Sequence, residues 1–227
     1  ALLVAAIRAE VRGGADKDAW WISSGVVHAL GLFQTMRERY NCTAADFAVL
    51  VDQLSIYGRG EALSQFDQVF NRQGGYREPL RLDNGTFPVT PAPGEVNLTI
   101  NQLCNGLGID TQTYQYLALA VAGAHGITNN TFKRSLPIIS SFYRLVRLSR
   151  LLGITPVEGV LMLTILGGEV WLNGVAGEPE IDPIRGISPD VLNIIDALQG
   201  CVQWCRGNDL PVLWVLQHAA EPSPARE

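Results

Sequence analysis

Four short turns, each between two apolar helix-like segments, constrain the fold of this 227-residue chain more than any other feature. Each turn has Gly or Asn at the end of one segment and Thr or Asp two residues later. The four copies are Asn41-Cys42-Thr43, Gly108-Ile109-Asp110, Gly153-Ile154-Thr155 and Gly207-Asn208-Asp209. Gly and Asn tolerate the left-handed conformation that ends a helix, and Thr and Asp accept hydrogen bonds from the N–H groups that begin one. The pattern therefore predicts αα-hairpins and an all-α fold.

We expect a single α-helical domain over residues 1–219, an irregular bundle of αα-hairpins, and a frayed tail over 220–227. The predicted helices span 18–40, 43–57, 63–70, 99–107, 110–123, 137–152, 155–168, 190–206 and 210–218. Two Gly/Pro-rich excursions, over 71–98 and 169–187, interrupt them. Asp83-Asn84-Gly85 is a hairpin signal between 80–82 and 86–89, and a second small β-ribbon is expected near Asn173.

The composition indicates a folded chain with part of its surface covered. Hydrophobic residues make up 47% and charged residues 17% of the sequence. Both values argue against disorder, and the charged fraction lies below the usual ~25%. A low charge content favours a surface covered by another domain or subunit, although a large core would have the same effect.

The sequence contains no residue pattern typical of catalysis. His28, His125 and His218 fall in separate helical segments without zinc-binding spacing, and no nucleotide-binding or nucleophile-elbow motif is present. Most carboxylates occupy expected helix caps, where they complement the positive end of a helix. We therefore predict no enzyme, no catalytic or cofactor-binding residue and no metal site.

Three arginines, Arg144, Arg147 and Arg150, recur on one face of the predicted helix over 137–152. A nucleic-acid-binding patch and a solvated helix face are both compatible with this spacing. The net charge of −5 and the scatter of the other basic residues favour the solvated face. No nucleic-acid partner is expected.

The cysteines and tryptophans are interpreted mainly as core residues. Cys42, Cys104, Cys201 and Cys205 lack disulfide or zinc spacing and are predicted to be small buried residues. The tryptophans are Trp20, Trp21, Trp171, Trp204 and Trp214. They could anchor an interface, but helix-hairpin packing favours the core, with Trp204 and Trp214 facing each other.

The start of the sequence predicts a segment of a longer protein, because it opens on Ala1 without Met. No basic region followed by a sustained apolar stretch is present, so no classical signal peptide is expected. No run of ~20 uninterrupted apolar residues exists, and we predict no direct membrane insertion by this segment.

Two stretches resemble the A component (TcA) of bacterial insecticidal Tc toxin complexes. The first runs from Ser55-Ile56-Tyr57-Gly58 through Glu61–Asn71, and the second from Ser141-Phe142-Tyr143-Arg144-Leu145 to Thr155-Pro156-Val157-Glu158. Ala197–His218 is similar to the next hairpin of that family, whereas Gly159 stands where the family has Leu. The α-helical region of plasmid-encoded virulence A proteins is similar as well.

The resemblance implies a place in the α-helical shell around a pore-forming channel. It also implies a secreted or cell-surface toxin that assembles as a homopentamer and delivers a payload supplied by its B and C components. The partners of this segment would be other domains of the parent chain and other subunits, with the B and C components reached only indirectly.

Two hypotheses for function follow. The first is a non-enzymatic structural and assembly segment of such a toxin. The second is a free-standing helical-repeat adaptor that binds a protein in a groove. An adaptor needs polar capping ends, and the apolar opening over residues 1–7 favours the first hypothesis.

Overall fold

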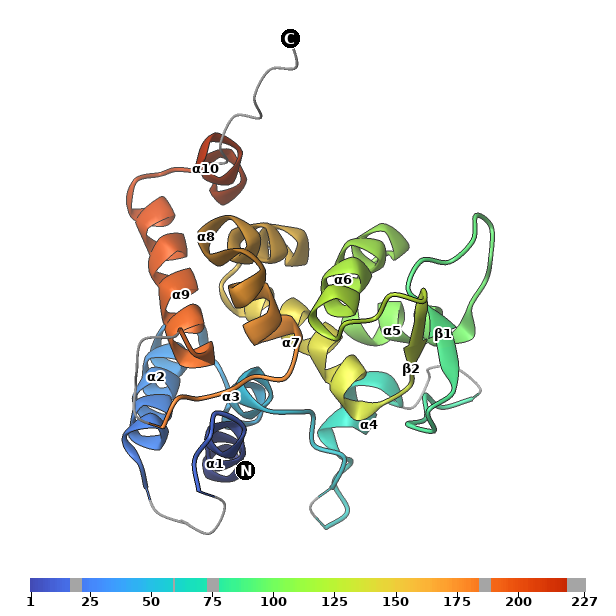
Figure 1. Cartoon of the computed structure of the whole chain (residues 1–227), viewed down its shortest axis with the longest axis horizontal. Coiled ribbons are helices and arrows are strands. Elements are labelled where there is room, and N and C mark those ends of the chain that lie inside the picture. The colour runs from blue at the N-terminus through green and yellow to red at the C-terminus, as the bar shows by residue number, and fades with distance from the viewer. Residues whose placement is uncertain (17–21, 59, 73–77, 184–188, 220–227) are drawn as a thin grey trace.

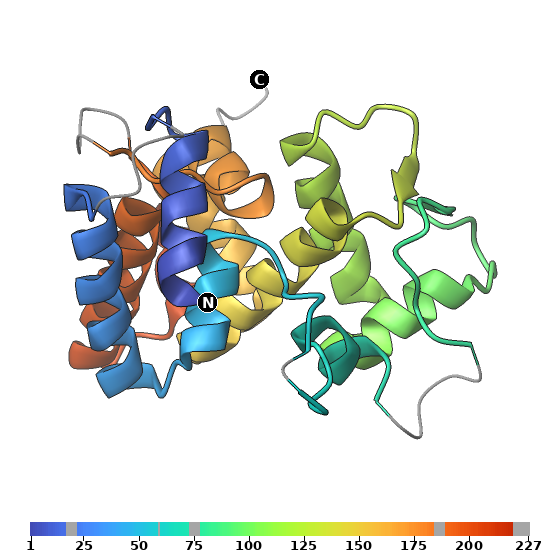
Figure 2. The same cartoon turned by 90° about the horizontal axis from the view of Figure 1, so that it is seen from below.

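The structure, a computed structural model, describes residues 1–16, 22–58, 60–72, 78–183 and 189–219 (Figures 1 and 2). Trp20, Trp21 and the predicted tail over 220–227 lie outside these residues. Within the described part, ten helices and one two-stranded sheet confirm the all-α prediction. The helices are α1 (Leu2–Arg12), α2 (Ser24–Tyr40), α3 (Ala44–Val51), α4 (Gln65–Phe70), α5 (Leu98–Leu107), α6 (Thr111–Ala124), α7 (Leu136–Leu151), α8 (Pro156–Ala176), α9 (Val191–Gly207) and α10 (Val212–Ala219).

Helix α7 is the centre of the fold. It contacts α3, α6 and α8, and Figure 2 shows it running between a group that contains α1, α2, α3 and α9 and a group that contains α4, α5 and α6. Twelve of its sixteen residues are buried. A helix buried on nearly every side belongs to the core rather than to an amphipathic surface layer.

Three of the four predicted turns have the expected geometry. The left-handed residues are Asn41, Gly108 and Gly153, with φ of 52°, 60° and 69°. The capping residues are Thr43, Asp110 and Thr155, and each side chain accepts a hydrogen bond from the backbone N–H three residues later. Local side-chain chemistry therefore fixes these hairpins.

The prediction for the fourth turn is wrong in its assignment of roles. Gly207 is still part of α9, and Asp209 is the left-handed residue, with φ of 54°. Asp is one of the few residues other than Gly that visit this region. Helix α10 begins only at Val212, after Pro211, so Asp209 is not its N-cap.

Several predicted boundaries also differ from the structure. Helix α1 was not predicted, and α2 begins at Ser24, capped by Ser23, rather than at residue 18. Helix α3 ends at Val51 instead of near Tyr57. The carbonyl groups at this end accept hydrogen bonds from arginine side chains of other helices, which replace the next helical turn.

The predicted excursion over 169–187 is wrong for its first part, because α8 continues to Ala176. The helix bends at Gly168, whose φ of 60° and ψ of −150° are not helical. Asn173-Gly174 lies inside the helix and forms no ribbon. The glycines and Asn173 are therefore accommodated within a helix that tertiary contacts hold in place.

The first excursion does carry the predicted ribbon, but with a different partner strand. Strand β1 (Thr86–Pro88) pairs antiparallel with β2 (Thr131–Lys133), and Phe87 lies opposite Phe132. Asn84 has the expected positive φ of 58°, yet residues 80–82 form no strand. Phe132 packs edge-on against Phe142 of α7, so the long-range pairing joins the ribbon to the core.

Candidate functional site

The buried arginine of α7 is the first feature that the sequence did not reveal. Arg144 was predicted on a solvated face, but only 1% of its surface is exposed. Its guanidinium donates hydrogen bonds to backbone oxygens at the ends of two helices and to one hydroxyl. The acceptors are Val49 O (3.2 Å), Asp52 O (2.5 Å), Val175 O (2.5 Å), Gly177 O (2.6 Å) and Ser141 Oγ (3.4 Å).

The acceptors explain how a cation is tolerated in the core. Val49 and Asp52 lie at the C-terminal end of α3, and Val175 and Gly177 at that of α8. Helix C-termini carry partial negative charge and free carbonyl groups, so two of them together solvate the guanidinium. Burial and the charge of Arg12 lower the pKa of Arg144 to about 9, and the side chain stays protonated at neutral pH.

The other two arginines of the row also make internal contacts. Arg147 forms a bidentate salt bridge with Asp46 of α3. The Nε–Oδ1 and Nη2–Oδ2 distances are both 2.8 Å. Burial raises the pKa of Asp46, but hydrogen bonds from Arg147 and Thr43 and the charge of Arg147 outweigh it, so the pKa is lowered. Arg150 donates to Gly108 O at the end of α5 at 2.7 Å. The row therefore joins α7 to α3, α5 and α8, and of its three side chains only Arg150 is exposed, as predicted.

The sequence offered one signal for this arrangement. Arg144 follows Ser140 and Ser141, two small residues on the same helix that are also fully buried. Ser140 Oγ accepts a hydrogen bond from the backbone N–H of Leu54, and Ser141 Oγ lies 2.9 Å from His125 Nε2. Small polar residues beside an Arg in an otherwise apolar helix indicate space and hydrogen-bonding partners for that side chain.

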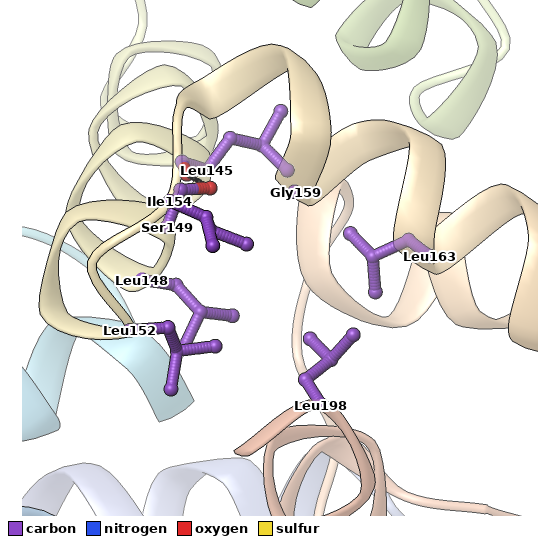
Figure 3. Close-up of a pocket in the computed structure, with 8 residues that line it drawn as sticks. All are labelled: Leu145, Leu148, Ser149, Leu152, Ile154, Gly159, Leu163 and Leu198. Carbon is purple, nitrogen blue, oxygen red and sulfur yellow. Dashed lines mark hydrogen bonds between the residues drawn. The ribbon is translucent and has the colours of Figure 1, made fainter. Parts of the chain in front are cut away.

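Helices α7 and α8 approach each other closely at Gly159 (Figure 3). Gly159 lies against Ser149 Oγ, and a Cβ atom at position 159 would collide with it. Leu145, Leu148 and Leu163 line the small apolar pocket beside this contact. Gly159, where the resemblance leads one to expect Leu, is thus a packing residue of this α7–α8 contact.

The second feature is an apolar surface on neighbouring helices, which the low charge content predicted in general but did not assign to particular residues. Trp204 and Trp214 are 57% and 48% exposed, so the prediction that they face each other in the core is wrong. We call the exposed large apolar residues of α6, α8, α9 and α10 the outer apolar surface. Its residues are Tyr116, Leu119, Leu161, Leu166, Val170, Trp204, Leu213 and Trp214.

The outer apolar surface is poor in charge. Helix α8 lies between α6 and α10 and contacts both (Figure 1). Helices α6 and α10 contain no Asp, Glu, Lys or Arg, α8 contains only Glu158 and Glu169, and α9 contains Asp196 and Arg206. Depletion of charged residues together with exposed aromatic side chains is typical of the centre of a protein–protein interface. Exposed side chains of this kind suit contact with an apolar surface of another protein part.

The remaining candidate residues do not converge. Within the described residues, no group of three or more His, Cys, Asp and Glu side chains could hold a metal ion. His125 contacts Ser141, and His218 stacks on Trp214 with ring centres 4.1 Å apart.

The cysteines are only partly as predicted. Cys42 and Cys205 are buried, whereas Cys104 and Cys201 are partly buried. Burial raises the pKa of the Cys42 thiol to about 12.

Helix α8 is long and apolar enough to cross a membrane by length and composition. The sequence did not reveal this because Gly, Thr, Asn and Glu interrupt its apolar residues. In the structure it bends at Gly168 and contacts α6, α7, α9 and α10. Core helices of soluble proteins meet the same criterion, but only 28% of the 18-residue stretch that meets it is buried here.

Comparison with known proteins identifies relatives of the whole fold. The chain is 31% identical over 200 residues to toxin subunit YenA1 of Yersinia entomophaga, an alignment that covers 88% of this chain. The chain is a relative of the Tc toxin A components. No protein-family model matches it.

Solved toxin structures share the fold. TcdA4 of Morganella morganii matches 88% of this chain with a TM-score of 0.66 at 15% identity. TcaA-TcaB of Yersinia pseudotuberculosis matches 93% of it with a TM-score of 0.64 at 16% identity. This Tc toxin relative spans only 17% of the length of YenA1 and 8% and 10% of the two solved chains.

Proposed function

We propose that this chain is a structural and assembly segment of a pore-forming toxin A component. The observation that carries the proposal is the outer apolar surface, where eight large side chains are exposed on helices almost free of charge. Such a surface is typical of an interface that is covered in the assembled protein. The relation to Tc toxin subunits supplies the assembly in which it would be covered.

In this proposal the segment forms part of an α-helical shell around the channel. The outer apolar surface packs against other domains of the parent chain and against neighbouring subunits, and the complete A component assembles as a pentamer. The B and C components and the payload make no direct contact with it. The assembled toxin acts outside the bacterium that makes it, as a secreted or cell-surface protein.

A non-enzymatic role is part of the proposal. The buried and capping carboxylates are engaged in structure: Asp46 pairs with Arg147, and Asp110 and Glu158 take part in helix caps. A general acid or base needs a group placed to reach a substrate. The relation to toxin subunits also favours this role over that of a free-standing adaptor.

The first test compares stability with assembly. Replacing Trp204 and Trp214 by Gln in the full-length toxin subunit should lower the yield of the assembled complex in size-exclusion chromatography. The same double variant of the 227-residue chain should keep its melting temperature, because both side chains are already exposed. Tyr57→Gln is the matched control, since Tyr57 is exposed outside the outer apolar surface. Normal assembly of the double variant would contradict the proposed interface.

The second test concerns the shell assignment. The purified chain should form no channel in planar lipid bilayers, whereas the complete A component should conduct under the same conditions. Robust single-channel currents from the chain alone would refute its assignment to the shell.

A further inference from the structure

Helix α8 consists of two helical segments joined by a glycine pair. Residues 156–167 form the first segment and residues 169–176 the second, which we call the arm. Gly168 between them has φ of 60° and ψ of −150°, a conformation that residues with a side chain rarely adopt. Apart from its chain neighbours and the nearby backbone of α8, no atom lies within 4 Å of the position that a Cβ of Gly168 would take. The bend therefore depends on backbone conformation at Gly168 and is not enforced by packing there.

Gly167 has a different reason to lack a side chain. The indole ring of Trp171 lies directly over it, and a Cβ atom at position 167 would overlap that ring. Gly167 thus lets the first residues of the arm fold back beside the end of the first segment. The two glycines together provide both the unusual backbone angle and the space that the bend requires.

The arm is held mainly at its far end. Val175 and Ala176 are buried, and Arg144 donates to Val175 O and Gly177 O at 2.5 and 2.6 Å. The near end is less buried: Val170 is 63% exposed, whereas Trp171 and Leu172 are partly buried and pack against the core.

A cleft of about 690 Å³ borders the arm. Val170, Asn173 and Gly174 line it from the arm, and Asp190 and Val191 line it from the start of α9. Space beside the arm removes the steric obstacle that close packing normally places in the path of a moving helix. The arm therefore has a bend at Gly168 on one side, a buried end on the other and a cleft beside it.

We propose that the arm is a hinged element, latched by Arg144 and able to swing about Gly168. In the latched state described by the structure, the guanidinium holds the carbonyl groups at the end of the arm. In the released state, Gly168 takes helical angles and α8 becomes one continuous 21-residue helix. Hinges of this kind use a few residues that absorb large changes in φ and ψ.

The test measures the distance between the two segments by double electron–electron resonance. Spin labels go on Val157→Cys and Asn173→Cys, in a background that lacks the four native cysteines. A continuous helix separates these two Cα atoms by about 24 Å, and the bent helix brings them closer. The parent chain should show mainly the shorter distance, and Gly168→Ala should move most of the population to the longer one.

Two further variants keep the outcome decisive. Gly123→Ala, in α6 and with free space around it, should leave the distance distribution unchanged. Arg144→Lys keeps the charge but loses the planar set of donors, and it should add a longer-distance population without moving the hinge. If Gly168→Ala does not fold, Arg144→Lys decides the question. A folded Gly168→Ala with the parent distance, or an Arg144→Lys with only the shorter distance, overturns the proposal.

Discussion

Helices α7 and α8 pack against each other, yet the more polar helix, α7, is mostly buried and the more apolar helix, α8, is buried far less. Helix α7 contains three arginines and three serines and buries twelve of sixteen residues. Helix α8 contains two charged residues and buries only five of twenty-one. Burial of polar groups requires hydrogen-bonding partners, and α7 finds them in the carbonyl ends of α3, α5 and α8. Exposure of an apolar helix, in turn, indicates a surface that another protein part covers.

The largest expected effect tests the interior of α7. Arg144→Met should destabilise the chain by about 3–5 kcal/mol, because it leaves buried carbonyl oxygens of α3 and α8 without donors. Arg150→Met is the matched control on the same helix. Arg150 is exposed and makes one hydrogen bond, so its loss should cost less than about 1 kcal/mol. Urea unfolding measures the stability of both variants. Equal stabilities would contradict the claim that the buried Arg144 matters far more to the fold than the exposed Arg150.

Substitution at the contact between α7 and α8 should have the next largest effect on stability. Gly159→Ala should cost about 1–3 kcal/mol, since the new methyl group collides with Ser149 Oγ. Ser149→Ala in the same chain removes that oxygen and should restore much of the stability, which a double-mutant cycle in urea reveals. Gly31→Ala, in free space on α2, should cost nothing or stabilise slightly. Additive effects of the two substitutions would show that the helices do not meet there.

Substitution in the turn that connects α7 to α8 should have a smaller effect on stability. Thr155→Ala should cost about 1 kcal/mol, because the side chain caps α8 in a reciprocal pair with Glu158. Asp209→Gly provides the contrast at the fourth turn. Asp209 occupies a left-handed position and caps no helix, so glycine there should be neutral or stabilising. A loss of about 1 kcal/mol from Asp209→Gly, seen in thermal melts, would restore the predicted capping role.

We expect the smallest effect from the protonation of His125, which contacts Ser141 of α7. Burial and the charge of Arg144 lower the pKa of His125, although Glu178 and the backbone of Ala176 oppose the shift. The unfolded chain then binds the proton more readily than the folded chain, so this group destabilises the fold as the pH falls below about 6.5. His125→Gln should therefore flatten the dependence of the unfolding free energy on pH between about pH 7 and 5. If His125→Gln leaves the dependence of the unfolding free energy on pH unchanged, folding does not alter the proton affinity of His125, which would contradict this prediction.

The sequence predicts the parts of the fold that local chemistry determines. Asn41, Gly108 and Gly153 have one plausible role each, and the structure confirms all three. Asp209 was misassigned because Asp both caps helices and tolerates left-handed angles. Local rules offer no means of choosing between these two roles.

The residues of the outer apolar surface and the burial of Arg144 could not be predicted for a different reason. Periodicity along one helix places Arg144 relative to its own helix, but its burial depends on where the ends of α3 and α8 lie. The exposure of Trp204 and Trp214 likewise depends on how far α10 is displaced from α9. Both are long-range properties of packing, and helix-period patterns carry little information about them.

The most direct test of the account is the accessibility of Trp204 and Trp214 in the chain alone and within the full-length toxin subunit. Hydroxyl-radical labelling followed by mass spectrometry measures it, with exposed Tyr57 as the internal reference. Both tryptophans should react readily in the isolated chain and be strongly protected in the full-length subunit, while Tyr57 reacts in both. Equal labelling of Trp204 and Trp214 in the two samples would contradict the claim that the outer apolar surface is an assembly interface.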